Sequence, residues 1–266
     1  MTVNLPNTEE DSIDIWLAFY HGLEDEAHAA RLRVLLSEDE RVQEPRYYFA
    51  DDRKRYLVTR ALVRTVLSRY APIAPCDWVF AKNEYGRPHI ASDTLTACTE
   101  AQSLRFNISH TRGLIALAVT RGREVGVDVE NLTTRAVSLG IADRFFSPME
   151  VAELGQVPVH AQQDKFFEYW TFKESYIKAR GMGLSLPLNR FSFHYPHARA
   201  VRIVIEPDLE DDAERWSFWQ CRPGTEYLLA LCAERRPGPP PVVRLLRLLP
   251  LLHEDTMTAE FTRRSC

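Results

Sequence analysis

Two short segments of the chain carry acidic and basic side chains at spacings suited to metal and phosphate chemistry. Asp128 and Glu130 stand two residues apart, which puts both carboxylates on one face of a strand, about 6.6 Å from each other. Glu174 and Lys178 stand four residues apart, which makes them neighbours on one face of a helix. Carboxylate oxygens select Mg²⁺ or Mn²⁺ over zinc. Together with a lysine to neutralise phosphate charge, they predict a site where a divalent cation meets phosphate groups.

Each of these residues also has a simple structural interpretation. Two acidic residues on an exposed strand face are usually solvated, and a Glu and a Lys four apart usually form a surface ion pair worth a few tenths of a kcal/mol. His110 follows a predicted strand, where a turn histidine can cap nearby backbone groups. Spacing alone therefore does not identify a site, and the order of the motifs along the chain has to be considered.

The strand and the helix that would carry these residues are predicted from hydrophobic periodicity. Valines alternate with the acidic residues over 125–130, which indicates a strand with its apolar face turned away from Asp128 and Glu130. A helix is predicted from about Gln163, with aromatic residues spaced three, four and seven positions around Lys173. It is expected to end at Gly181, where glycine can take the left-handed cap conformation.

A shorter helix is predicted just before this one. Pro148 suits a first helical position, Ser147 suits the N-cap, and Glu150 falls in the first turn. A carboxylate there is a common partner of the helix dipole, which is the structural alternative to a catalytic role for Glu150.

The remaining pattern alternates strands and helices. Strands are expected over 13–20, 78–81, 104–108 and 114–120, helices over 28–36, 51–70 and 136–146, a loop over 91–102, and a closing antiparallel sheet over 191–195, 201–205, 216–221 and 228–232. The proline-rich stretch 237–241 interrupts the pattern, and the tail that follows it receives no assignment.

Composition excludes several classes of protein. The 266 residues carry a net charge of −4, with 45% hydrophobic and 26% charged residues, which is typical of a soluble globular protein and not of a general nucleic-acid binder. No apolar run approaches the ~20 residues that a membrane span requires. The five cysteines are scattered and odd in number, so we expect a reducing, cytoplasmic setting.

Four motifs follow one another in a specific order. They read Phe106-Asn107-Ile108-Ser109-His110-Thr111, Gly126-Val127-Asp128-Val129-Glu130, Arg144-Phe145-Phe146-Ser147-Pro148-Met149-Glu150, and Trp170-Thr171-Phe172-Lys173-Glu174-Ser175-Tyr176-Ile177-Lys178. This set resembles the 4′-phosphopantetheinyl transferases of the larger, surfactin-synthetase-activating type, over about residues 37–193. Four motifs in order are far less frequent by chance than any one of them.

The resemblance implies an α+β fold of two similar α/β halves, each a small antiparallel sheet with helices, related by a pseudo-twofold axis. The halves would be residues 1–122, on the coenzyme side, and 123–236, with the metal and the catalytic helix, followed by the tail 237–266. Such an enzyme transfers the 4′-phosphopantetheine group of coenzyme A to a serine of an acyl or peptidyl carrier protein and releases adenosine 3′,5′-bisphosphate. It needs Mg²⁺, with Mn²⁺ as a substitute, and a monomer is expected, without nucleic-acid or membrane partners.

The resemblance also assigns roles to individual residues. Asp128, Glu130 and Glu174 match the magnesium ligands, and Lys173 and Lys178 match the pyrophosphate contacts. Ser109 and His110 match residues on the 3′-phosphate side of the coenzyme, and Arg55 and Arg87 fall where relatives place further coenzyme contacts. Glu174 and Glu150 both remain candidates for the base that takes the serine proton, with Glu174 preferred. The segment 131–146 is the expected docking face for the carrier.

One segment departs from the family pattern. Relatives often have lysines where this chain reads Glu40-Arg41-Val42-Gln43, which leaves open how the 3′-phosphate is bound. Two other functions stay open as alternatives, a non-catalytic binding module for coenzyme A or a carrier protein on the same fold, and an unrelated Mg²⁺-dependent phosphohydrolase.

Overall fold

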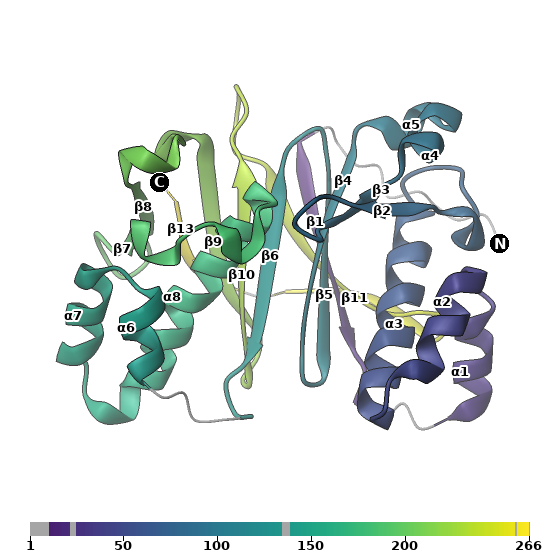
Figure 1. The fold of residues 1–266 in the computed structure, drawn as a ribbon, viewed down its shortest axis with the longest axis horizontal. Helices are drawn as coiled ribbons and strands as arrows, with labels where there is room; N and C mark the ends of the chain where they lie inside the picture. Colours follow the sequence, from purple (N-terminus) through teal and green to yellow (C-terminus); the bar gives the residue numbers. More distant parts are fainter. Residues whose placement is uncertain (1–10, 22–24, 135–138, 259, 266) are drawn as a thin grey trace.

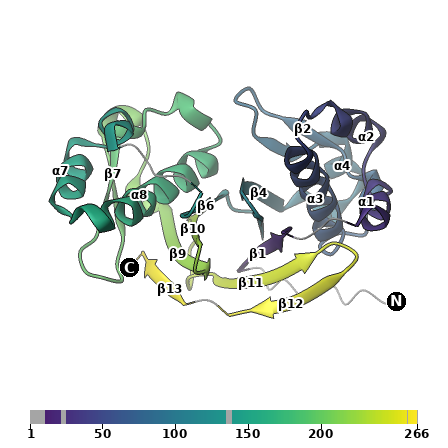
Figure 2. The same cartoon turned by 90° about the horizontal axis from the view of Figure 1, so that it is seen from below.

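Two β-sheets stand beside each other at the centre of the molecule, and helices flank them on both outer sides (Figure 1). A view turned by a quarter shows the same division into two halves (Figure 2). The computed structural model describes residues 11–21, 25–134, 139–258 and 260–265. The α+β fold class is thereby confirmed, while the pseudo-twofold relation between the halves stays a prediction.

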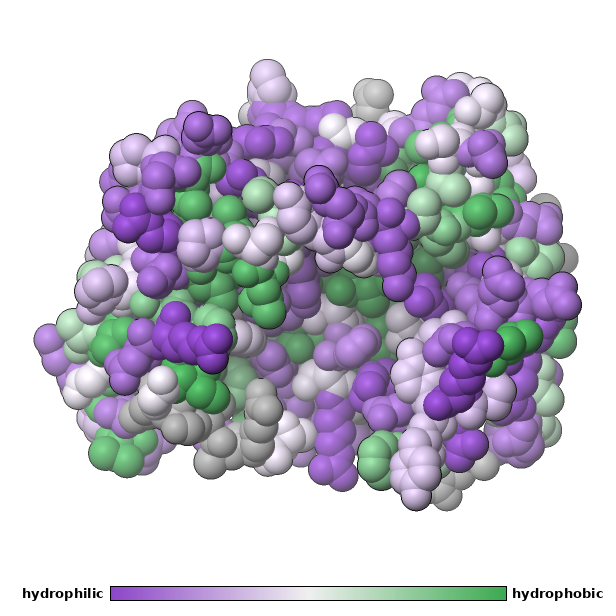
Figure 3. Space-filling view, in the orientation of Figure 1, coloured by the Kyte–Doolittle hydropathy of each residue, from purple (hydrophilic) through white to green (hydrophobic). Residues whose placement is uncertain are grey.

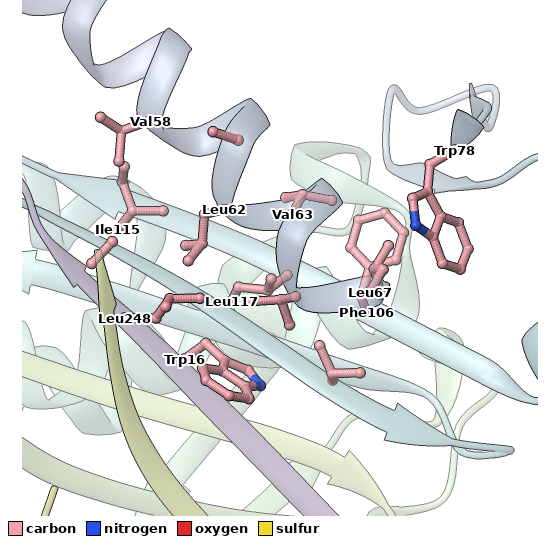
Figure 4. Close-up of a cluster of buried hydrophobic side chains, with 14 of the residues drawn as sticks. Trp16, Val58, Leu62, Val63, Leu67, Trp78, Phe106, Ile115, Leu117 and Leu248 are labelled. Carbon is pink, nitrogen blue, oxygen red and sulfur yellow. The ribbon is translucent and has the colours of Figure 1, made fainter. Parts of the chain in front are cut away.

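The N-terminal half is built around a five-stranded sheet. Its elements are β1 (Ser12–Phe19), α1 (Glu26–Arg33), α2 (Glu38–Gln43), α3 (Ala50–Leu67), β2 (Phe80–Lys82), β3 (Pro88–Ile90), α4 (Ser92–Ala97), α5 (Thr99–Gln102), β4 (Leu104–Thr111), β5 (Leu114–Arg121), β11 (Val242–Leu249) and β12 (His253–Met257). The strand order is β12-β11-β1-β5-β4. α3 lies across one face, where Val58 and Leu62 pack in one cluster with Trp16 and Leu117 (Figure 4). Burying such side chains is the main favourable term in holding a helix on a sheet.

The C-terminal half is built around a four-stranded sheet and one long helix. Its elements are β6 (Val125–Asn131), α6 (Ala142–Phe145), α7 (Pro148–Gln156), α8 (Val159–Arg180), β7 (Phe191–His194), β8 (Arg202–Ile205), β9 (Trp216–Gly224), β10 (Tyr227–Glu234) and β13 (Phe261–Arg264). The antiparallel sheet has the order β13-β9-β10-β6, and β7 and β8 form a separate ladder. α8 buries Tyr169, Phe172 and Tyr176 completely. The aromatic stripe predicted on this helix is therefore the core of its half.

The two sheets share a third core between their inner faces. Ile13, Ile15 and Leu17 of β1 pack there in one cluster with the alternating valines of β6 and with Leu229 of β10. Since successive side chains of a strand point to opposite faces, these strands bury both faces. The layers are therefore helix, sheet, sheet and helix, and the halves are held together by apolar contact.

Side chains of β4 also join the two sheets along one edge. Asn107 Oδ1 accepts a hydrogen bond from Val127 N at 2.9 Å, Ser109 Oγ accepts one from Val129 N at 3.2 Å, and Thr111 Oγ1 accepts one from Asn131 N at 3.1 Å. Residues 107, 109 and 111 alternate, so they share one face of β4. Polar side chains of β4 thus supply hydrogen-bond partners to the backbone of β6 on this side.

The tail that the sequence pattern left unassigned supplies strands to both sheets. β11 pairs with β1 in parallel, with Ser12 opposite Val242, so the N-terminal sheet is mixed and not purely antiparallel. Arg244 of β11 pairs with the fully buried Asp14 through Nε at 2.6 Å. β13 then joins the edge of the other sheet beside β9. The chain end therefore spans both halves.

Most predicted elements are confirmed, with three differences. The four strands expected as one closing sheet divide, because β7 pairs with β8 while β9 and β10 join β6. The stretch 91–102 was expected to be a loop, and it forms α4 and α5. The helix expected over 136–146 is described only from residue 139, as a 3₁₀ turn followed by α6, and residues 135–138 lie outside the described part. Within the described ranges, no helix is both long and apolar enough to cross a bilayer.

Candidate active site

The site begins where α8 packs directly against β6. An ideal Cβ at Gly126 would stand 2.0 Å from the carbonyl oxygen of Ser175 and 2.4 Å from the backbone nitrogen of Ala179. Only a residue without a side chain allows this approach. Because Asp128 and Glu130 lie on the same face of β6 as Gly126, the contact places them beside Glu174 and Lys178.

Asp128, Ser109 and Lys178 form the centre of the site. The ammonium of Lys178 donates to Asp128 Oδ1 at 2.5 Å and to Ser109 Oγ at 3.0 Å. Ser109 Oγ in turn donates to Asp128 Oδ1 at 3.0 Å. Asp128 and Ser109 are both buried. Residues from β4, β6 and α8 thus converge at one point of the edge where the halves meet, and Figure 3 shows that the molecular surface is hollowed between the halves.

Burial and the negative charge of Asp128 affect the pKa of Glu174. Burial and the nearby Asp128 carboxylate raise the pKa of Glu174 to about 7, and the positive charge of Lys178 opposes the change. Two carboxylates in one partly desolvated site disfavour each other's ionisation. A bound cation would relieve this repulsion, and a deprotonated Glu174 would then be favoured.

Glu130 lies two residues after Asp128, on the same face of β6. Its Oε1 accepts a hydrogen bond from the indole Nε1 of Trp170 at 3.1 Å. Trp170 belongs to α8, one turn before Glu174. The helix therefore orients two carboxylates of the site, one on its own face and one on the strand.

The carboxylates of this site fit a divalent cation by their chemistry. Among the described residues, no three His, Cys, Asp or Glu side chains are gathered closely enough to be a ready metal site. Asp128 Oδ2, however, is buried and makes no hydrogen bond. A buried carboxylate oxygen without a partner costs free energy unless something binds it. Together with the neighbouring carboxylates, it suits Mg²⁺ by its hard oxygen chemistry.

Glu150 and Lys173 do not belong to this centre, and the structure corrects the roles expected for them. Both side chains are fully buried, and Lys173 Nζ lies 2.8 Å from Glu150 Oε2. Lys173 also donates to the carbonyl oxygens of Leu188 and Phe191 at 2.7 and 2.6 Å. Burial lowers the pKa of Lys173, and the Glu150 carboxylate opposes the change. Lys173 therefore crosses the C-terminal core and cannot reach a ligand in the cleft.

The two oxygens of Glu150 are fully used by backbone groups and by this ion pair. Oε2 accepts from Ser147 N at 2.9 Å, which closes a capping box at the start of α7, and Oε1 accepts from Phe193 N at 2.9 Å. Burial and these partners favour a structural role for Glu150 over that of a base for an incoming hydroxyl group. The structural alternative for Glu150, a helix-capping residue, is the one that the contacts support.

The residues expected on the coenzyme side form a second small site. Arg55 and His110 line a cavity of about 140 Å³ together with Tyr47, Asp52, Tyr56, Thr59 and Arg60. Desolvation by the cavity walls and the positive charge of Arg55 lower the pKa of His110, although the residue remains accessible to solvent. Ser109 and His110 are consecutive in β4, so their side chains leave the strand on opposite faces. One strand therefore connects the two sites.

Arg87, in the turn before β3, binds groups of β6, of α8 and of the residue before β6. Its guanidinium donates to the carbonyl oxygens of Ala179 at 2.9 Å and Val125 at 3.1 Å, and it pairs with Glu124 at 2.8 Å. Asn83 donates to Gly181 O at 2.8 Å. The turn before β3 thus holds the end of α8, whose cap Gly181 has φ 71° as predicted. The sequence predicted the turn at 84–88, but not this contact with a helix about 95 residues away.

Three further residues of the site were not predicted from their own pattern. Gly126, Asn107 and Trp170 lie inside the recognised motifs, yet nothing local distinguishes them as contact residues. The signal for Gly126 was available, because a glycine within a buried strand indicates close approach of another backbone.

Comparisons with known proteins agree with this arrangement. The model of the 4′-phosphopantetheinyl transferase superfamily matches residues 124–232, and the model described as 4′-phosphopantetheinyl transferase, N-terminal, matches residues 24–121. The chain is 34% identical over 203 residues to the 4′-phosphopantetheinyl transferase Sfp of Bacillus subtilis (strain 168), covering 76% of this chain and 84% of that protein. It is 34% identical over 160 residues to the 4′-phosphopantetheinyl transferase HetI of Nostoc sp., covering 60% and 65%.

These relatives are transferases, so the protein, with its α+β fold, is a group-transfer enzyme. The chain belongs to the 4′-phosphopantetheinyl transferase superfamily.

Proposed function

We propose that this protein transfers the 4′-phosphopantetheine group from coenzyme A to a serine of an acyl or peptidyl carrier protein, in a Mg²⁺-dependent reaction that releases adenosine 3′,5′-bisphosphate. The observation that carries the proposal is the convergence of Asp128, Ser109, Glu174 and Lys178 at the edge between two sheets. The names of the relatives point to the same reaction.

The charges of the site suit a pyrophosphate. Attack by the serine hydroxyl on the β-phosphorus builds negative charge on the pyrophosphate oxygens as the bond to the leaving bisphosphate breaks. Lys178, which pairs with Asp128 at 2.5 Å, can move its charge to those oxygens when the substrate arrives. Most of the rate then comes from positioned charges, because preorganised electrostatics dominates such reactions.

Asp128, Glu130 and Glu174 would hold the magnesium ion. When bound, Mg²⁺ supplies a Lewis acid that polarises the phosphoryl oxygens. Ser109 keeps the Asp128 carboxylate oriented through Oδ1, and Trp170 does the same for Glu130. These hydrogen bonds are the kind of support that fixes ligand geometry around a metal.

Glu174 is our candidate for the base that accepts the serine proton. Burial raises its pKa and the Asp128 carboxylate acts in the same direction, whereas Glu150 is fully buried and binds Lys173 and the backbone of Phe193. The carrier would approach over the segment 131–146, of which residues 135–138 lie outside the described part of the chain.

The reaction is tested by the intact mass of an apo carrier protein after incubation with this protein, coenzyme A and Mg²⁺. We expect a gain of one phosphopantetheine group per carrier, and no gain when EDTA is added. Without any gain on acyl or peptidyl carriers, and with measurable coenzyme A binding, the protein would be a binding module. Release of free phosphate without a carrier would instead indicate a phosphohydrolase.

A further inference from the structure

Two arginines of α3, Arg55 and Arg60, line the small cavity beside His110, and their ion pairs differ in length. Arg55 pairs with Asp52 at 2.7 Å. Arg60 lies over the ring of Tyr56, 5.2 Å from its centroid, and its ion pair with Glu40 is long at 3.8 Å. Arg60 Nε is buried and makes no hydrogen bond. Arg60 therefore lines this cavity with no ion pair shorter than 3.8 Å among the described residues.

Glu40 carries one negative charge for two arginines, Arg64 and Arg60, and its Oε1 lies 3.8 Å from Arg60 Nε, beyond hydrogen-bond distance. Glu40 Oε2 accepts from the buried Arg64 Nε at 2.7 Å and from Ser37 N at 3.2 Å, which closes the capping box of α2. The same acidic residue stands in the segment where the family pattern has lysines. In this chain α2 therefore brings a negative charge to the neighbourhood, and the positive charge comes from α3.

The size and lining of the cavity suit a single phosphate group. A volume of about 140 Å³ lies well below the 300–1,000 Å³ typical of pockets for whole organic ligands. Tyr47, Tyr56, Arg55 and Arg60 are among the residues that line it, and all four side chains carry hydrogen-bond donors. Asp52 is the acidic residue of the lining, and it is neutralised by Arg55.

The position of the cavity relates it to the reaction centre. Ser109 faces Asp128 and Lys178, while the next residue, His110, lines the cavity on the other face of β4. A ligand with a pyrophosphate at Lys178 and a second, separate phosphate could occupy both places. Burial and the positive charge of Arg55 lower the pKa of His110, which favours its neutral form and leaves the arginines as the permanent positive charges of the lining.

We propose that Arg60 is the residue that makes this protein select the 3′-phosphorylated coenzyme, supplying from α3 the positive charge that α2 lacks. The inference rests on the proposed function, because the 3′-phosphate belongs to coenzyme A. It assigns to Arg60 a binding role toward the substrate, with Glu40 held in place by Arg64 and the capping box.

The experiment compares coenzyme A with 3′-dephospho-coenzyme A as donors to one apo carrier protein. For the variant Arg60→Gln we expect kcat/KM for coenzyme A to fall about 10- to 100-fold, the loss of one charge-assisted hydrogen bond. The value for the dephosphorylated donor should change less than about twofold. Arg60→Lys keeps the charge and should recover part of the preference. Arg53→Gln, an exposed arginine of the same helix that does not line the cavity, is the matched control and should leave both values unchanged.

A calorimetric measurement separates this inference from the proposed function. Wild-type protein should bind adenosine 3′,5′-bisphosphate more tightly than adenosine 5′-monophosphate, and Arg60→Gln should lose that difference. If the wild type fails to transfer but shows this difference, the proposed function is wrong and the role of Arg60 stands. An equal loss for both donors in folded Arg60→Gln, or no loss for either, overturns the role of Arg60.

Discussion

Replacing Gly126 by alanine should disable the site without touching any of its charged residues. The added Cβ would stand 2.0 Å from Ser175 O and 2.4 Å from Ala179 N. Both are backbone atoms of α8, so no side chain can rotate away. Ordinary contact begins at 3.4 Å, which requires α8 and β6 to separate locally by about 1.4 Å, the difference between 3.4 and 2.0 Å. That shift carries Glu174 and Lys178 away from Asp128.

The expected magnitude follows from the sensitivity of catalysis to position. A misplacement of about 1 Å can cost on the order of 100-fold in rate, and overpacking a buried contact typically destabilises by about 1–3 kcal/mol. We therefore expect Gly126→Ala to lower the transfer rate by at least about 100-fold, with a moderately lower Tm.

The assay is the rate of phosphopantetheine transfer to an apo carrier, measured well below the melting temperature of the variant. Gly155→Ala is the matched control, because a Cβ there meets nothing within 4 Å. It should keep full activity and gain up to about 1 kcal/mol of stability from the better helix former. If Gly126→Ala turned over at the wild-type rate, the packing of α8 on β6 would not be what aligns the site.

Four further perturbations test other parts of the structure. Asp128→Ala removes the carboxylate that joins Lys178 and Ser109 and should abolish transfer while the circular dichroism spectrum stays unchanged. The pKa of Glu174 is raised to about 7 from 4.5, so the metal-free protein should lose stability as the pH rises through that window. Glu174→Gln should therefore raise the Tm at pH 8 and much less at pH 5. An equal effect at both pH values would contradict the raised pKa. Lys173→Met leaves the buried Glu150 carboxylate without its ion-pair partner. It should lower the free energy of unfolding in urea by about 3–5 kcal/mol and leave the KM for coenzyme A unchanged. A raised KM would show that Lys173 contacts the coenzyme. Arg244→Met strands the buried Asp14 and should cost roughly 3 kcal/mol, whereas Arg247→Met in the same strand breaks only an exposed pair with Asp255 and should cost well under about 1 kcal/mol.

The elements that carry the site were predictable because their signals are local. Alternating valines fixed the face of β6 that bears Asp128, and Ser147 with Pro148 and Glu150 marked the start of α7. The aromatic spacing around Lys173 indicated a buried helix face. That same spacing places Lys173 itself on the buried face, where the structure has it.

The errors concern contacts between residues that are distant in sequence. The partner of Lys173 is Glu150, and the two meet only because α7 and α8 pack together. Residues 91–102 are small and polar, with weak helix propensity, and the core that takes up Ala101, Leu95 and Cys98 decides their conformation. The pairing of β1 with β11 joins residues 230 positions apart, and no local pattern contains it.

The strands of the tail have a consequence for how the protein acquires its fold. β1 lies near the beginning of the chain, but β11, the strand that pairs with its outer edge, is synthesised more than 200 residues later. The edge of β9 is covered later still, by β13. During synthesis both sheets therefore have unpaired edge strands until the tail is made, and such edges can pair with strands of other chains. Contacts of such long sequence separation also slow folding. Although the molecule has two halves, the N-terminal sheet cannot be completed before Met257 has been synthesised, nor the C-terminal sheet before Arg264. The two halves should therefore reach the native state together and not one after the other.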